Sequence, residues 1–183
     1  MAGGEESREK RKLKVDMDGL ELAFDDRSGE HSHYLDLETG QVVVLFTDEI
    51  QRELEKIYEG MPEEEAEDSF EEAPRERDLP DCLKDEVRDA HRVEAGYGER
   101  FVRVPNTESR EAYGDMEEFF ETVGDGRLQE LLEVAINGKG AFRRFKDVLA
   151  RRPGQEERWF RFSADRERRR VLEWLEEEGI EPV

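Results

Sequence analysis

The segment from Gly138 to Arg144 holds the residues whose types and spacing best suit a chemical task. Gly138 and Gly140 flank Lys139, and Arg143 and Arg144 follow at the start of a helix-like run. Glycines leave backbone N–H groups accessible, and a helix N-terminus stabilises an anion through these groups and through its dipole. The two guanidinium groups can bind phosphate in a bidentate manner. These five residues are therefore a candidate anion-binding site.

The same residues also suit a tight turn between two helices, and the sequence favours this interpretation. The spacing lacks the G-x-x-x-x-G-K-[ST] order of a P-loop, and the preceding residues have the periodicity of a helix rather than a strand. Gly138 suits the left-handed position after a helix, and Arg143 lies one turn before Asp147. We therefore expect a structural turn with weak anion affinity.

His31 and His33 are the other residues with the spacing of a ligand pair. In an extended segment they lie on the same side, and Asp36 could join them around a metal ion. Polar residues beside a hairpin are more often solvated, so we predict no metal and no cofactor. The acidic pairs elsewhere are expected by chance in a chain with 50 Asp and Glu residues. No catalytic signature stands out, and the sequence favours a protein that is not an enzyme.

The composition indicates a folded, soluble protein of the cytoplasm. The 183 residues include ten Phe, two Trp and four Tyr, which can build one core, and a single cysteine, which precludes an intramolecular disulfide. No window approaches the roughly 18 apolar residues of a membrane helix, and the N-terminus lacks the apolar stretch that a signal peptide is expected to have. The formal net charge of −21 argues against nucleic acid as a partner, although it can also reflect the host's genome or salt content.

The elements of the N-terminal part follow from hydrophobic periodicity. Residues 1–13 offer nothing to bury, so they are predicted to form a disordered tail. Residues 14–60 are expected to contain a helix, a β-hairpin and a second helix, although a strand alternation competes in the first of these. The hairpin is predicted over about 34–46, after the loop RSGEHSH, and it turns at Gly40, which can adopt a positive φ.

The remaining sequence predicts a linker followed by a mainly helical part. Residues 61–79 are dominated by acids and prolines and are expected to be a flexible acidic linker. A helix at 81–95 and a strand at about 100–104 follow, and this strand can join the hairpin. Further helices are predicted, and the last of them is marked by apolar residues from Val171 to Ile180. We therefore expect an α+β fold with a small antiparallel sheet, in which 80–183 forms one domain with 14–60.

Several segments together resemble an uncharacterised family of bacterial proteins. They are YLDLETGQV, the E-x-x-x-x-M-x-x-F run from Glu111 to Phe119, GKGAFRRFKD, Trp159 with Phe162, and the closing WLEEEGIEP. The resemblance covers about residues 14–58 and 81–183 and leaves the acidic stretch as an elaboration. Members of that family are small cytoplasmic proteins with no assigned activity, so the resemblance implies an α+β domain but no mechanism.

Two classes of function remain open from the sequence. The favoured class is a non-catalytic interaction or regulatory module with an unidentified protein partner. The alternative is a binder of a phosphate-bearing ligand or nucleic acid through the Gly138-Lys139-Gly140 turn and the basic residues that follow. Residues 138–170 contain 12 Lys and Arg against five Asp and Glu, and their simplest role is ion pairing within the chain. An enzyme would need a pocket in which polar groups converge.

Overall fold

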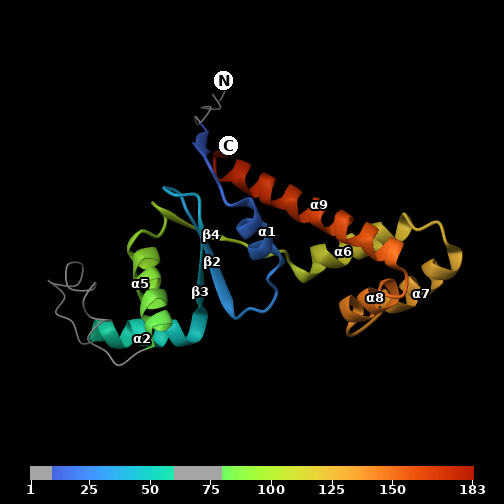
Figure 1. The fold of residues 1–183 in the computed structure, drawn as a ribbon, viewed down its shortest axis with the longest axis horizontal. Coiled ribbons are helices and arrows are strands. Elements are labelled where there is room, and N and C mark those ends of the chain that lie inside the picture. The colour runs from blue at the N-terminus through green and yellow to red at the C-terminus, as the bar shows by residue number, and fades with distance from the viewer. Residues whose placement is uncertain (1–9, 60–79) are drawn as a thin grey trace, which may run out of the picture. The chain divides into compact units, whose positions relative to one another are not determined.

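The computed structural model describes residues 10–59 and 80–183 and divides the chain into two compact units. Unit 1 runs to Pro105 and includes Gly179–Val183, and unit 2 comprises Asn106–Glu178. Together the described residues form seven helices, a three-stranded antiparallel sheet and a parallel pair of strands (Figure 1). The α+β fold predicted from the sequence is confirmed, whereas the prediction of a single domain stays a prediction.

The N-terminal tail is shorter than the sequence predicted. Arg11–Leu13 form strand β1, which pairs in parallel with β5, Ile180–Pro182, near the other end of the chain. Only Leu13 of β1 is buried, and three residues with two charges carry no periodicity that would reveal a strand. The remaining tail residues, 1–9, and the predicted acidic linker at 61–79 lie outside the described residues.

Unit 1 is built on the predicted hairpin and a third strand. β2, His31–Asp36, is the central strand, between β3, Val42–Phe46, and β4, Phe101–Val104, and both pairings are antiparallel. The strand predicted near residue 100 therefore joins the hairpin, as expected. β2 begins earlier than predicted, because His31, placed in a loop by its polar neighbours, pairs with Phe46 at the end of β3.

The hairpin turn requires glycine at position 40. Gly40 has a φ of +73°, which confirms the positive φ expected there and which non-glycine residues rarely adopt. A Cβ atom at this position would lie 2.0 Å from the carbonyl oxygen of Lys14. The carbonyl of Gly40 also accepts a hydrogen bond of 2.8 Å from the N–H of Asp16. The turn therefore packs directly against the segment that leads into the first helix.

Helices cover the sheet of unit 1 on both faces (Figure 1). α1, Met17–Asp25, is the predicted helix rather than the competing strand, and its N-cap residue Asp16 accepts a hydrogen bond from the N–H of Gly19. α2, Thr47–Glu59, and α5, Asp81–Ala95, pack against each other and against the opposite face.

The core of unit 1 lies between the sheet and helices α2 and α5. Its buried members are aliphatic residues from both helices and from β3, together with one aromatic ring from β4: Leu45, Ile50, Leu54, Ile57, Val87, Ala90, Val93 and Phe101. Burying a large apolar side chain stabilises a fold by roughly 1.5–3 kcal/mol relative to its exposure. The apolar stripes of the two helices therefore hold them on this face.

Unit 2 is formed by four helices. They are α6, Ser109–Glu121, α7, Gly126–Ile136, α8, Ala141–Leu149, and α9, Pro153–Glu177. The first three follow the predicted apolar stripes. The last helix starts much earlier than predicted, because Pro153 occupies its first turn, where a missing N–H costs nothing. Ile180, predicted to continue the last helix, belongs to β5 instead.

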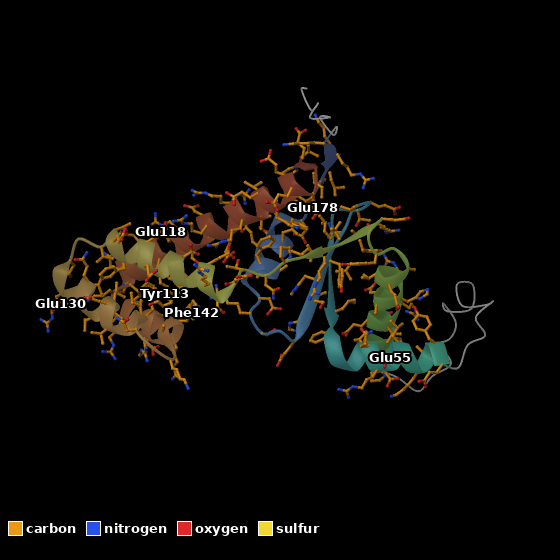
Figure 2. All side chains as sticks on the ribbon, turned by 180° about the vertical axis from the view of Figure 1, so that it is seen from behind. Glu55, Tyr113, Glu118, Glu130, Phe142 and Glu178 are labelled. Carbon is orange, nitrogen blue, oxygen red and sulfur yellow. The ribbon has the colours of Figure 1, made fainter. Side chains whose placement is uncertain are left out.

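Aromatic rings form the centre of unit 2. The ring of Trp159 lies 4.8 Å from that of Phe145 and 5.3 Å from that of Phe119, in edge-to-face arrangements that aromatic pairs prefer. All three are buried, and the partly buried Tyr113 and Phe142 pack against them (Figure 2). The same core includes Leu128, Leu132 and Ile136 of α7, so it holds the four helices of the unit together. None of the described helices is long and apolar enough to cross a membrane.

Candidate functional site

The candidate anion site lies in the connection between α7 and α8. α7 ends at the C-cap residue Asn137, and Gly138 and Gly140 follow with φ values of +87° and +77°. Both glycines therefore take the left-handed conformation that a tight turn after a helix requires. Neither backbone could adopt these angles with an ordinary side chain without strain.

Arg144 is directed at this turn from the first part of α8. Its guanidinium group donates hydrogen bonds to three carbonyl oxygens, those of Ala135 at 3.2 Å, Asn137 at 2.5 Å and Lys139 at 2.5 Å. The last carbonyls of a helix have no partner within it, and a cation nearby satisfies them. The arrangement uses Arg144 as a cap for α7, and these donors point toward the protein backbone.

Most cations after the turn also contact partners within unit 2. Arg170 donates to Asp115 at 2.7 Å, and Asp115 is buried. Arg166 contacts Glu118, and Arg158 donates to the hydroxyl of Thr122 at 2.9 Å. At least seven of the twelve Lys and Arg residues between 138 and 170 have such a contact: Arg143, Arg144, Arg152, Arg158, Arg161, Arg166 and Arg170.

His31 and His33 lie on one face of β2, but their carboxylate partner is Asp26, not Asp36. An oxygen of Asp26 lies 3.0 Å from Nδ1 of His31 and 3.7 Å from Nε2 of His33. Burial lowers the pKa of His33, against the opposing influence of Asp26. Asp36 is on the other face, because successive side chains of a strand alternate. Within the described ranges, no set of three or more His, Cys, Asp or Glu side chains is arranged to hold a metal ion.

Asp36 instead forms a bidentate ion pair with Arg100. The Arg100 guanidinium donates to the two carboxylate oxygens at 3.0 and 2.7 Å, and its Cζ atom lies 5.2 Å from the centre of the Phe101 ring. Burial of the Asp36 carboxyl opposes ionisation, but the hydrogen bonds from Arg100 and from the N–H of Glu38 outweigh it and lower the pKa to about 2. This pair fixes the start of β4 against the end of β2.

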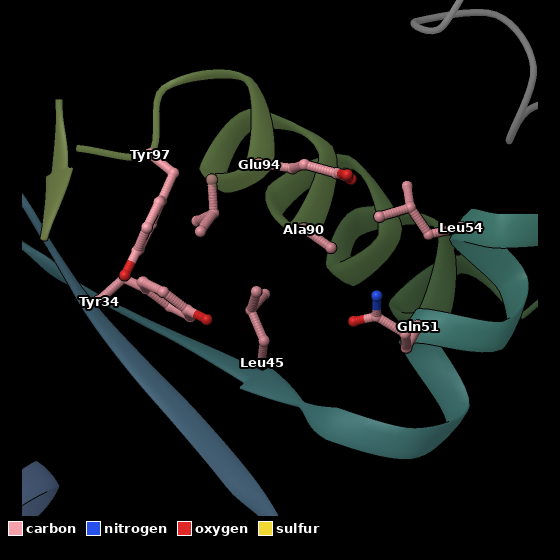
Figure 3. Close-up of a pocket in the computed structure, with 8 residues that line it drawn as sticks. Tyr34, Leu45, Gln51, Leu54, Ala90, Glu94 and Tyr97 are labelled. Atoms are coloured by element: carbon pink, nitrogen blue, oxygen red, sulfur yellow. The ribbon is translucent and has the colours of Figure 1, made fainter. Parts of the chain in front are cut away.

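A pocket of about 330 Å³ opens in unit 1 between the sheet and helices α2 and α5 (Figure 3). The sheet contributes an aromatic ring and an aliphatic side chain, and the two helices contribute most of the remaining wall. The lining residues are Tyr34, Leu45, Gln51, Leu54, Ala90, Val93, Glu94 and Tyr97. The deepest of these are buried aliphatic residues of the core, so the pocket has an apolar floor.

The walls of the pocket are aromatic and polar. The rings of Tyr34 and Tyr97 have centres 6.3 Å apart and planes at 81°, and Tyr97 is 60% exposed. Gln51 and Glu94 are also exposed, and they lie on α2 and α5 at the rim (Figure 3). The arrangement can therefore bind a group that has an apolar part and a polar or charged end.

Glu94 is held in place by Tyr58 of α2. The Tyr58 hydroxyl lies 3.1 Å from Oε2 of Glu94, to which it donates, and 2.9 Å from Nδ1 of His91. Burial, followed by the charge of Glu94 and its hydrogen bond, raises the pKa of Tyr58 to about 12. A general base works best with a pKa near the operating pH, so this shift makes Tyr58 a poor one. Its hydroxyl links α2 to α5 beside the pocket.

Sequence reasoning did not find this pocket. Tyr34, Gln51 and Glu94 come from three separate elements, and Tyr97 follows Glu94 in the turn after α5, so no local spacing joins the whole set. The apolar stripes of α2 and α5 were visible, but a stripe indicates a core face and not an opening in it. The one available signal was Tyr97 between two glycines, an aromatic residue in a turn with no core to join.

Comparisons with known proteins give a family without an activity. The model of an uncharacterised protein family, UPF0158, matches residues 79–183. The chain is also similar to a UPF0158 protein of Pseudomonas aeruginosa, with 23% identity over 173 residues that span 94% of this chain and 88% of that protein. No solved structure matches the chain. Because the family model spans more than half of the chain, the protein belongs to the uncharacterised protein family UPF0158.

Proposed function

We propose that the protein is a non-catalytic interaction module of the cytoplasm and that the pocket of unit 1 receives a side chain of a protein partner. The observation that supports this most directly is the make-up of the pocket walls. Buried aliphatic side chains form the floor, and the exposed Tyr97, Gln51 and Glu94 surround the opening. Apolar surface in the centre and polar groups at the rim are the usual pattern of a protein-binding surface.

The size of the pocket suits one side chain. Its volume of about 330 Å³ is at the lower end of the roughly 300–1,000 Å³ that ligand sites occupy. Tyrosine at the opening is typical of contact surfaces, because its ring buries area with little loss of conformational entropy and its hydroxyl still finds a hydrogen-bond partner. A partner residue can therefore anchor here while the surrounding chain contacts α2 and α5.

The hydrogen-bonded set of Tyr58, His91 and Glu94 is an arrangement in unit 1 that resembles acid–base machinery. The phenol of Tyr58 is protonated near neutral pH, as a tyrosine ordinarily is, and the upward shift of its pKa to about 12 makes the loss of this proton still harder. The proton is directed at Glu94. A proton held in this way supports a structural link between two helices rather than proton transfer to a substrate. The proposal therefore treats Glu94 as part of the pocket rim, held by Tyr58 beside the pocket.

The alternative of a phosphate or nucleic-acid ligand is less well supported. Arg144 donates to backbone carbonyls, and Arg143 lies 3.9 Å from Asp147. Lys139 is exposed at the same turn, but one cation and two glycines form a weak site in a strongly acidic chain. The proposal gives nucleic acid no role.

Selection from a library of random 12-residue peptides on the immobilised full chain tests the proposal. We expect enriched peptides to lose at least about fivefold in affinity for Tyr97→Ser, which removes a wall of the pocket. The matched control is Leu22→Ser, because Leu22 is 73% exposed but lies on α1, away from the pocket. Peptides that bind Tyr97→Ser and the unchanged protein equally well, or a selection without any binder, would refute the proposed site.

A further inference from the structure

We infer that the pocket of unit 1 binds a positively charged side chain, arginine or lysine, presented by the protein partner. The inference rests on the proposed function and names the chemistry of the anchoring group. It is drawn from the aromatic walls, the acceptors at the rim, the charge of the two helices and the apolar floor.

The aromatic walls suit a cation. Tyr34 and Tyr97 stand at 81° to each other, so they form two sides of a corner. A guanidinium or ammonium group within about 6 Å of a ring centre is attracted by the negative face of the ring. A group placed in this corner would contact both rings, and arginine can stack its planar head on either of them.

The polar groups at the rim are hydrogen-bond acceptors. Glu94 accepts the hydrogen bond from Tyr58 on one oxygen, Oε2, and a carboxylate can accept several further hydrogen bonds. The side-chain amide of Gln51 lies across the pocket from Glu94 (Figure 3) and offers a carbonyl oxygen. A donor-rich cationic head therefore finds acceptors on α2 and on α5.

The helices around the pocket carry excess negative charge. α2 and α5 together contain ten Asp and Glu against five Lys and Arg. Four of these five cations pair with an acid three positions earlier in the same helix, namely Lys56 with Glu53, Lys84 with Asp81, Arg88 with Asp85 and Arg92 with Asp89. Each of these four cations is thus offset by an acid, and the excess negative charge that remains on the two helices attracts a positive group to the pocket.

The apolar floor of the pocket suits the methylene part of a long basic side chain. Leu45, Leu54 and Val93 are buried and apolar, and they suit the methylene stem of arginine or lysine, which packs on apolar surface while its head stays polar. The described residues of unit 1 already contain an example of this chemistry. Arg100 is held between the carboxylate of Asp36 and the ring of Phe101.

One cation of the chain opposes the ligand. Arg103 of β4 lies directly across from Tyr34 in the strand register, so its side chain is on the same face of the sheet. It is exposed and is not among the lining residues. Its charge should repel a cationic ligand, and Arg103→Gln is therefore expected to strengthen binding about two- to threefold.

The test uses defined probes on the full chain labelled with 3-fluorotyrosine. Of its four tyrosines, Tyr34 and Tyr97 line the pocket, and Tyr58 contacts the lining residue Glu94. Tyr113 of unit 2 is an internal control. The probes are the N-acetyl methylamides of arginine, of its neutral isostere citrulline and of norleucine. We expect arginine to shift the pocket signals with a Kd on the order of millimolar and to bind about five- to thirtyfold more tightly than citrulline.

Variants separate the charge of the pocket from its shape. Glu94→Gln should lower the affinity for arginine severalfold and leave norleucine unaffected, whereas Glu55→Gln, at an exposed position of α2 outside the pocket (Figure 2), should weaken arginine binding much less than Glu94→Gln does. Raising NaCl from 50 to 500 mM should weaken arginine binding, since salt screens charge. Tetramethylammonium binding as tightly as arginine would point to a small amine and overturn the choice of a protein side chain.

Two outcomes separate this inference from the proposed function. Norleucine or citrulline binding as tightly as arginine would overturn the cationic ligand, while the pocket would still bind a partner side chain. If none of the probes shifted the pocket signals at concentrations up to about 50 mM, well above a millimolar Kd, the inference would fail. The peptide selection would then decide separately whether unit 1 binds a partner at all.

Discussion

Replacing Arg144 by alanine should destabilise unit 2 far more than replacing the neighbouring cations. Its guanidinium group donates to three backbone carbonyls at the end of α7 and in the turn. By contrast, the Arg143 side chain is 90% exposed and makes a long ion pair of 3.9 Å with Asp147. Lys139 contributes to the turn through its backbone carbonyl, which accepts a hydrogen bond from Arg144. Lys139→Ala leaves this carbonyl in place. The sequence offered Arg143 a partner in Asp147 and offered Arg144 none, whereas the structure gives Arg144 three carbonyl partners.

The magnitude follows from the number of bonds and their exposure. A hydrogen bond from a charged donor contributes about 1.5–3 kcal/mol when its loss leaves a buried partner unsatisfied. Arg144 is exposed, so water can replace it at each carbonyl, and about 0.5–1 kcal/mol per bond is the better figure. Three bonds then give roughly 1.5–3 kcal/mol for Arg144→Ala. Arg144→Lys should recover about 0.5 kcal/mol, because a cation near the end of α7 still stabilises the helix dipole.

Urea unfolding followed by tryptophan fluorescence measures this effect in the right unit, since Trp159 and Trp174 are the two tryptophans and both belong to unit 2. Arg143→Ala and Lys139→Ala serve as controls and should each change the free energy of unfolding by less than about 0.5 kcal/mol. An Arg144→Ala variant as stable as these controls would refute the capping role. Loss of inorganic phosphate binding without loss of stability would instead support the anion site.

Three further substitutions test the fold. Phe145→Ala removes the ring at the centre of unit 2 and should cost about 3–5 kcal/mol in urea unfolding, and a loss below about 1 kcal/mol would contradict that placement. Gly40→Ala should cost more than about 2 kcal/mol by thermal unfolding, because it combines a positive φ with a clash against a backbone carbonyl. The pKa of Asp36 is lowered from 3.8 to about 2, so the stability that it contributes is complete above about pH 4 and is lost as the pH falls toward 2. Circular dichroism should show that Asp36→Asn is less stable than the unchanged protein near neutral pH and that this difference shrinks below pH 4.

The parts of the fold that the sequence could predict are those with local signals. The apolar stripe of α8, the hairpin around Gly40 and the helix over 81–95 follow from periodicity and turn chemistry. β1 escaped prediction because its partner lies at the other end of the chain, and a pair of three-residue strands has too few side chains to form a pattern. The sequence did not predict the N-terminal part of α9, because a proline usually marks the end of a helix. In the structure Pro153 is in the first turn of the helix, where proline is favourable.

The candidate sites show a different limit. Local spacing brought Gly138, Lys139 and Arg144 together correctly in space, but it could not tell which acceptor Arg144 would meet. The answer depends on the carbonyls left at the end of α7, which exist only once the helix has formed. Local signals could not assemble the pocket, since Tyr34 and Tyr97 are 63 positions apart and meet through the pairing of β2 with β4.

What unit 1 can bind depends on the hydrogen-bonding groups that its fold leaves at the surface of the pocket. In both units many arginines are committed to internal acceptors, as Arg100 is to Asp36 and Arg170 to Asp115. The acceptors at the pocket, in contrast, are accessible to a partner. Glu94 accepts a hydrogen bond from Tyr58 on one oxygen, and its side chain remains exposed. Internal cations are therefore held elsewhere while acceptors stay accessible beside aromatic rings, so a cation supplied by a partner is the group that best completes the site.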